Sequence, residues 1–176
     1  MVLQRLFGQR PAKEKGAALY AVAVEQSRQP FLYADLGAPD TVEGRFEVYT
    51  LHVMLLLDRL RGQGAPAADI SQALFDVYVS ALDDALREMG VGDMAVGRKM
   101  RKLGEAFYGR AKSYEAALAA LPDRKPLEDL VARTLLADAP GAPTQPFAAY
   151  VEHQRAALAG QPLADLLDAR VAWSAS

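Results

Sequence analysis

The chain has 176 residues, a formal net charge of −2 and a pI near 5.7. Its hydrophobic fraction of 51% indicates one globular domain with a core of its own, and its slightly acidic balance excludes a protein whose whole surface binds nucleic acid. Because the chain contains no cysteine, disulfides, thiol nucleophiles and thiolate metal sites are excluded, which suits the cytoplasm.

Residues 1–10 carry apolar and basic side chains without a continuous apolar core, so they predict a flexible N-terminus and no secretory signal. Their apolar side chains can touch a membrane surface or another helix. The longest strongly apolar stretch, residues 53–57, is far shorter than the roughly 20 residues that cross a bilayer. We expect a cytoplasmic protein whose membrane contact, if it has one, is peripheral and lies at the inner face of the cytoplasmic membrane.

The first helix is expected from Pro11 to about Arg28, because proline is accepted in a first helical turn and Pro30 stops the helix. Residues 31–39 mix large apolar side chains with turn formers. They predict a loop that packs onto the core rather than a free linker.

The second helix is expected to start at the capping-box pair Asp40 and Glu43 and to run to about Arg61. It is apolar on two nearly opposite sides, which predicts a place at the centre of a bundle. The two apolar sets are Phe46, Tyr49, Val53, Leu56, Leu57 and Leu60, and Val48, Leu51 and Leu55. A thin polar strip holds Glu43, Glu47, Asp58 and Arg61. Arg45 and His52 share one mostly apolar flank, so both need polar partners.

Five more helical segments follow. They are expected over 66–88 and 94–108, with a continuation past Gly109, and from about Leu127, Phe147 and Leu163. No segment alternates with the period of a strand. We therefore expect an all-α fold, a single-domain multi-helix bundle of about six to eight helices that occupies residues 11–176.

The helix expected over 94–108 follows the turn formed by Gly90 and Gly92 and is capped by Asp93. Its apolar stripe holds Val96, Met100, Leu103 and Phe107, and its opposite face holds Arg98, Lys99, Arg101 and Lys102. A third face carries Gly97 and Gly104 beside Tyr108. The glycines fit either a tight helix crossing or a groove for a partner, and the cations fit either a solvated face or an anionic partner. We predict that these two faces, with Arg110, bind a partner.

No motif predicts catalysis: neither His52 nor His153 has a carboxylate three residues before it, and no P-loop, dinucleotide fingerprint or nucleophile elbow occurs. A lone histidine in a buried helix is usually a hydrogen-bonded core residue. We expect no enzymatic activity, no metal and no cofactor, and we expect Arg45 and His52 to fix the loop 33–40 by hydrogen bonds.

Two alternatives stay open. The first is a small helical haem- or small-molecule-binding protein, or an enzyme, that uses Arg45 and His52. The second is an RNA-binding module built on the basic helix, although the sequence offers little exposed aromatic surface for stacking bases.

Several motifs, in the same order along the chain, resemble the ubiquinol-cytochrome c chaperone family. They are residues 33–47, which include Asp40, Gly44, Arg45, Phe46 and Glu47; Leu51-His52-Val53; Gly90-Val91-Gly92-Asp93 with Gly97; and Phe107-Tyr108-Gly109-Arg110. The resemblance covers roughly residues 30–115.

This resemblance implies a non-enzymatic assembly chaperone for the cytochrome bc1 complex, ubiquinol-cytochrome c reductase. Mitochondrial members of the family bind near the ribosomal tunnel exit with a small partner protein and hold newly made cytochrome b. For this chain we expect a bacterial-type member whose partner is cytochrome b or another bc1 subunit. The ribosome and a small partner protein are further expected partners, and no sequence-specific nucleic acid is expected.

Overall fold

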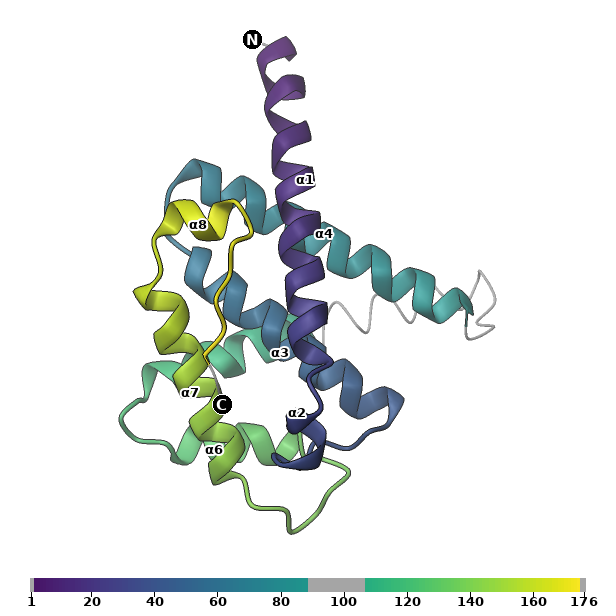
Figure 1. Cartoon of the computed structure of the whole chain (residues 1–176), viewed down its shortest axis with the longest axis vertical. Coiled ribbons are helices and arrows are strands. Elements are labelled where there is room, and N and C mark those ends of the chain that lie inside the picture. The colour runs from purple at the N-terminus through teal and green to yellow at the C-terminus, as the bar shows by residue number, and fades with distance from the viewer. Residues whose placement is uncertain (1, 89–106, 175–176) are drawn as a thin grey trace.

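The computed structural model describes residues 2–88 and 107–174, and every regular element in these ranges is an α-helix, as the apolar periodicity predicts (Figure 1). None of the helices in these ranges is both long and apolar enough to cross a membrane. The predicted all-α fold is therefore confirmed.

Helix α1 (Val2–Ser27) crosses α4 (Ala65–Glu88), and its N-terminal part projects beyond the rest of the molecule (Figure 1). The crossing is close, because a Cβ atom added at Gly16 would lie 2.6 Å from the Cβ of Ala73. The helix start predicted at Pro11 is wrong. Pro11 lies inside α1. Because proline has no N–H, one backbone hydrogen bond of the helix is missing there, and the helix continues on both sides of it.

Helix α2 (Phe31–Ala34) is a single turn in the segment for which the sequence predicts a loop. The segment packs onto the core as expected, because Leu32 and Ala38 are both buried. Its position is fixed by hydrogen bonds to the end of α1: the hydroxyl of Tyr33 donates to the carbonyl oxygen of Ser27 at 2.7 Å.

Helix α3 (Val42–Leu60) is capped by Thr41, whose hydroxyl accepts a hydrogen bond from the Gly44 N–H at 3.0 Å. The capping residue is therefore Thr41, one residue later than the Asp40 of the predicted capping box. Thr41 has the extended backbone that a capping residue needs, and Asp40 is paired elsewhere.

Helix α3 lies at the centre of the bundle, as its two apolar sides predict, and contacts α1, α4 and α7. Its buried residues are Gly44, Val48, Thr50, Leu51, His52, Val53, Met54, Leu55, Leu56 and Leu60. Phe46, Tyr49 and Leu57, predicted for one of the two apolar sides, are only half-buried. Glu47, placed by the sequence on the polar strip, has a side chain that is 12% exposed.

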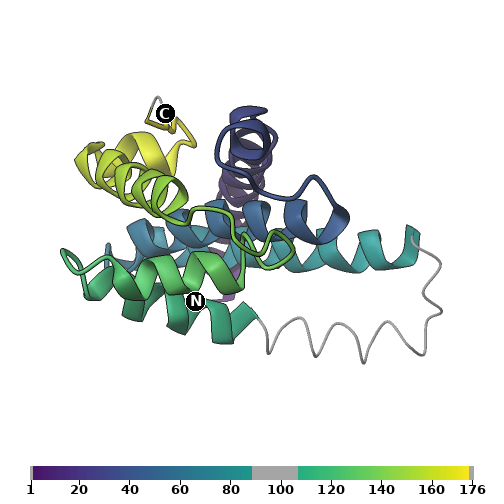
Figure 2. The ribbon, with the colours of Figure 1, turned by 90° about the horizontal axis from the view of Figure 1, so that it is seen from below.

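The C-terminal part contains a helical segment over residues 107–119, then α6 (Lys125–Arg133), α7 (Gln145–Gly160) and α8 (Leu163–Leu167). The face predicted for α7 is confirmed, since Phe147, Tyr150, Val151, Gln154 and Leu158 are buried. The last helix ends at Leu167, earlier than predicted, so Val171 belongs to a non-helical segment that runs beside α7 (Figure 1). Figure 2 shows α1 nearly end-on, at a steep angle to α3 and α4.

Candidate functional site

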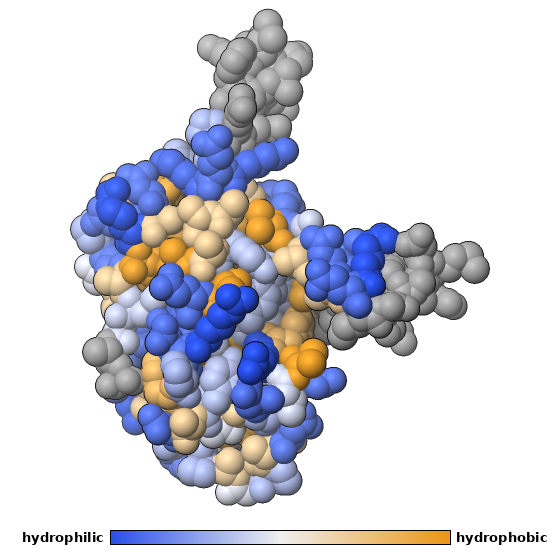
Figure 3. Space-filling view, turned by 45° about the vertical axis from the view of Figure 1, so that its right-hand side comes forward, coloured by the Kyte–Doolittle hydropathy of each residue, from blue (hydrophilic) through white to orange (hydrophobic). Residues whose placement is uncertain are grey.

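A groove of about 1010 Å³ lies between the C-terminal half of α1, the segment around α2, the first turns of α3 and the last turns of α4. Its apolar lining includes Tyr20, Val24, Val42, Phe46, Tyr49 and Leu82. Figure 3 shows apolar side chains in the angle below the projecting end of α4, next to hydrophilic ones. Three helices therefore form the walls of an apolar groove that opens at the surface.

Aromatic rings form much of one wall. The ring of Tyr49 packs edge-on against Tyr20, with centroids 5.4 Å apart, and lies 5.2 Å from the ring of Tyr78. Burial raises the pKa of Tyr49 and raises the pKa of Tyr78 to about 12, so both phenols stay neutral at physiological pH. Tyr49 therefore presents a large uncharged ring to the groove, and the buried ring of Tyr78 packs behind it.

Charged groups lie at the rim of the groove. The guanidinium of Arg45 binds the carboxylate of Asp40, with Nε and Oδ1 2.5 Å apart, and this hydrogen bond lowers the pKa of Asp40. Arg45 thus contacts the 33–40 loop, as predicted. Its side chain is 65% exposed, however, so the apolar flank expected for Arg45 is wrong.

Gly44 lets the first turn of α3 lie directly against this loop. A Cβ atom at position 44 would lie 2.1 Å from the carbonyl oxygen of Pro39, a distance at which something must move. The requirement for glycine here is therefore steric, since the position leaves no room for any side chain.

The outer side of α3 is joined to the helical segment 107–119 by an ion pair between Glu47 and Arg110. Two hydrogen bonds connect the carboxylate and the guanidinium, and that from Nε to Oε2 is 2.7 Å long. The pair is largely shielded from water, with the side chains of Glu47 and Arg110 12% and 27% exposed. Arg110, predicted to bind a partner, already binds Glu47, which lines the groove.

Tyr108, also predicted to bind a partner, is 62% exposed. Its ring lies 6.1 Å from the rings of Phe75 and Phe107. The side chain is thus accessible to a partner, and the partner-binding role of Tyr108 stays a prediction.

His52 is fully buried and contacts α7 rather than the loop. Its Nδ1 lies 2.7 Å from the carbonyl oxygen of Val48, and its Nε2 lies 2.7 Å from the hydroxyl of Tyr150. Burial lowers the pKa of His52 to about 4, so the ring is neutral. The arrangement that satisfies every group has Nδ1–H donating to Val48 and the Tyr150 hydroxyl donating to Nε2, while Gln26 donates to that hydroxyl at 3.0 Å.

His52 is therefore a hydrogen-bonded core residue, as expected, but the predicted contact with the 33–40 loop is wrong. Both ring nitrogens are engaged, which leaves none to bind haem or to act as a base. Arg45 and His52 thus have separate partners and separate surroundings. No cluster of three or more His, Cys, Asp or Glu side chains that could hold a metal ion occurs within 2–88 and 107–174.

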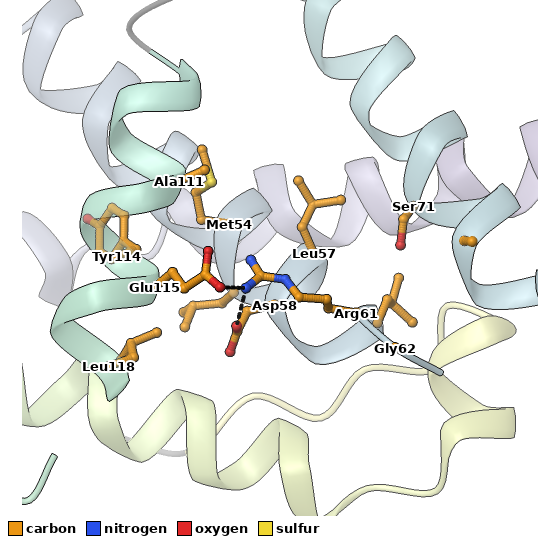
Figure 4. A pocket seen from close by; sticks show the side chains of 13 residues that line it. Met54, Leu57, Asp58, Arg61, Gly62, Ser71, Ala111, Tyr114, Glu115 and Leu118 are labelled. Atoms are coloured by element: carbon orange, nitrogen blue, oxygen red, sulfur yellow. Dashed lines mark ion pairs between the residues drawn. The ribbon is translucent and has the colours of Figure 1, made fainter. Parts of the chain in front are cut away.

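A smaller cavity of about 350 Å³ lies between α3, the start of α4 and the 107–119 segment (Figure 4). Arg61 reaches across it toward Glu115, at 2.7 Å, and toward Asp58, at 4.0 Å. The two carboxylates offset the charge of Arg61, so this cation, the one among the described lining residues, is not available for an anionic ligand.

Nine predicted site residues lie outside the described residues: Gly90, Gly92, Asp93, Gly97, Arg98, Lys99, Arg101, Lys102 and Gly104. The basic face therefore stays a prediction. The sequence does not predict the groove, because the helical spacing of Tyr20, Tyr49 and Leu82 is the same for the lining of a groove as for a closed core. Val42, directly after the cap of α3, lines the groove and is 67% exposed, which only the structure shows.

Comparison with known proteins gives a consistent result. The model of a family described as "Ubiquinol-cytochrome C chaperone" matches residues 34–173. Among solved structures, the protein in "Crystal structure of the Cbp3 homolog from Brucella abortus" shares 32% sequence identity with this chain and superposes on it with a TM-score of 0.86. The match covers 99% of this chain and 97% of that chain. No curated protein matches. The matched range extends from the end of α2 to Trp173.

Proposed function

We propose, because this chain belongs to the ubiquinol-cytochrome C chaperone family, that it holds newly made cytochrome b, or another bc1 subunit, while the complex is assembled. The proposed role is that of a non-enzymatic assembly chaperone. The observation that carries the proposed site is the apolar groove between α1, α3 and α4.

The groove suits a hydrophobic helix. A membrane-spanning helix of cytochrome b presents about 20 mainly apolar residues, which must be shielded from water before insertion. An apolar helix commonly binds in a groove between other helices, with large side chains inserted as anchors. The rings of Tyr20 and Tyr49 offer contact area for such anchors, and the ion pair of Asp40 and Arg45 lies beside them at the rim.

The further partners that we propose are inferred from the sequence. The basic residues 98–102 support contact with an anionic surface, for which the ribosome is our proposal, because dense cations with no acid among them bind phosphate-rich partners. A small partner protein and a peripheral position at the inner face of the cytoplasmic membrane complete the proposal.

Val42 and Tyr108 offer a test, because both are large apolar side chains that are exposed. Val42 lines the groove, whereas Tyr108 belongs to the partner-binding face predicted from the sequence. We expect Val42→Asp to remove most of the cytochrome b that co-purifies with the chaperone from cells that make the bc1 complex. Tyr108→Asp and the exposed control Ala137→Asp should retain it.

The three variants separate the possible sites. Loss with Tyr108→Asp alone would move the client site to the 107–110 face. Retention in all three variants, each folded by circular dichroism, would contradict the groove. If the wild-type chain never co-purifies with cytochrome b or another bc1 subunit, the proposed client itself is wrong.

A further inference from the structure

The chain's own last described residues, 171–174, lie in a slot along α7, and we call them the C-terminal strap. Gln161 donates from its side-chain amide to the Ala172 carbonyl at 2.8 Å and accepts from the Ala172 N–H at 2.8 Å. Gln154 does the same for Ser174, at 3.0 and 2.8 Å. The strap is thus held through its backbone by one glutamine in α7 and a second at the C-terminal cap of that helix.

This arrangement imitates the edge of a β-sheet. Residues two apart present their N–H and C=O groups to the same side only when the backbone is strand-like. The side-chain amides of Gln154 and Gln161 supply the donor and acceptor that a neighbouring strand would otherwise supply. Because they contact only backbone groups, the slot accepts different sequences, provided that no proline removes a required N–H.

The residue between the two gripped positions, Trp173, is directed into the molecule. Its ring packs edge-on against His52, with centroids 5.3 Å apart and planes at 88°. The indole Nε1 is buried and has no hydrogen-bond partner among the described residues. A buried N–H without a partner costs free energy, so a hydrocarbon side chain would fit this position better than the tryptophan that occupies it.

The turn that leads into the strap also carries some strain. Ala169 has φ of 57°, in the left-handed region that residues with a Cβ atom seldom adopt. The strap is therefore an imperfect occupant of its own slot, both at the turn and at the indole.

We propose that the slot formed by Gln154, Gln161 and His52 is a binding site for a strand-like peptide segment of a partner protein, which the C-terminal strap occupies in the free chain. The segment that fits has a phenylalanine or leucine at its centre, small flanking residues and no proline. Binding of this segment displaces the strap. The site is separate from the groove, so it does not depend on the proposed function.

The test uses Trp173 as its reporter, since it is the chain's sole tryptophan. The full-length variant Ala172→Pro loses the N–H that Gln161 accepts, so the strap should leave the slot and the tryptophan emission should move to longer wavelength. The probe is a fluorescein-labelled peptide of residues 170–176 carrying Trp173→Phe. We expect it to bind the Ala172→Pro chain at least about tenfold more tightly than wild type, because the competing strap is weakened.

Matched controls isolate the slot. The same peptide with proline in place of Ala172 should not bind. Adding Gln161→Ala to the Ala172→Pro chain should abolish peptide binding, whereas adding Gln63→Ala, at an exposed glutamine outside the slot, should leave it unchanged.

Three results would overturn the proposal. The first is unchanged emission of the Ala172→Pro chain, which would make the strap a fixed part of the fold. The second is equal binding of the two peptides. The third is a concentration-dependent dimer of the Ala172→Pro chain in sedimentation, which would make the occupant a second copy of this chain rather than a different partner.

Discussion

At the scale of single residues, Gly44 illustrates how a backbone contact dictates an amino acid. Gly44→Ala places a methyl group 2.1 Å from the Pro39 carbonyl oxygen, so α3 or the loop must move. We expect a loss of about 1 to 3 kcal/mol in the free energy of unfolding, measured by urea denaturation. Gly109→Ala is the control, since its new methyl group meets nothing within 4 Å, and it should be neutral or stabilise by up to about 1 kcal/mol.

His52 gives the fold a dependence on pH. Its pKa is lowered from 6.5 to about 4 by burial, so the unfolded chain binds the proton more readily. The histidine's contribution is complete above pH 6.5 and is lost as the pH falls toward 4. Between pH 7 and 5 we expect this residue to lower the free energy of unfolding by about 2 kcal/mol.

The measurement compares urea denaturation at both pH values in three proteins. His52→Gln should lose this part of the pH dependence, and His153→Gln, at the exposed second histidine, should keep it. The same dependence in the wild type and in both variants would assign it to other groups.

At the scale of elements, the ion pair of Glu47 and Arg110 docks the helical segment 107–119 onto α3. Because both side chains are largely shielded, each charge depends on the other more than a surface pair does. A double-mutant cycle with Glu47→Gln and Arg110→Gln should give a coupling energy of about 1 to 2 kcal/mol.

The matched control is the exposed pair of Lys125 and Asp129, one turn apart on α6. Its coupling energy should be far smaller, because water screens an exposed ion pair. Equal coupling energies in the two pairs would mean that water screens the pair of Glu47 and Arg110 as strongly as it screens an exposed pair.

The helices themselves were predictable, because their stability rests on local patterns. Apolar spacing predicted the buried face of α7 and the central place of α3, both of which hold. The contacts between elements were not predictable: His52 binds Tyr150, 98 residues further along the chain, and nothing near His52 in sequence indicates this. Likewise, the close crossing at Gly16 depends on Ala73, whereas the predicted role for stacked glycines fell on Gly97 and Gly104.

At the scale of the whole molecule, the groove and the strap differ from the helices in how they arise. The groove exists because α1, α3 and α4 diverge, so its lining residues satisfy helical periodicity without closing against one another. The strap is held by the side-chain amides of Gln154 and Gln161 and by the packing of Trp173 against His52. Neither feature has a local sequence signal, because each depends on how separate elements are placed.

The stability of the molecule should therefore be uneven, with α3 at the most stable end. Its residues 50–56 are all buried, and releasing their amides requires α1, α4 and α7 to separate. The amides of Ala172 and Ser174 donate to the side chains of Gln161 and Gln154, so we expect opening of the strap to free them while every helix stays folded.

Native-state hydrogen exchange in increasing urea should separate these two classes of amide. Those of residues 50–56 should exchange only with the full free energy of unfolding and a strong dependence on urea, because exposing them exposes the core. Those of Ala172 and Ser174 should exchange at a lower free energy, nearly independent of urea, because opening the strap exposes little surface. If they instead exchange together with α3, the strap unfolds only with the core and cannot give up its slot to a partner segment.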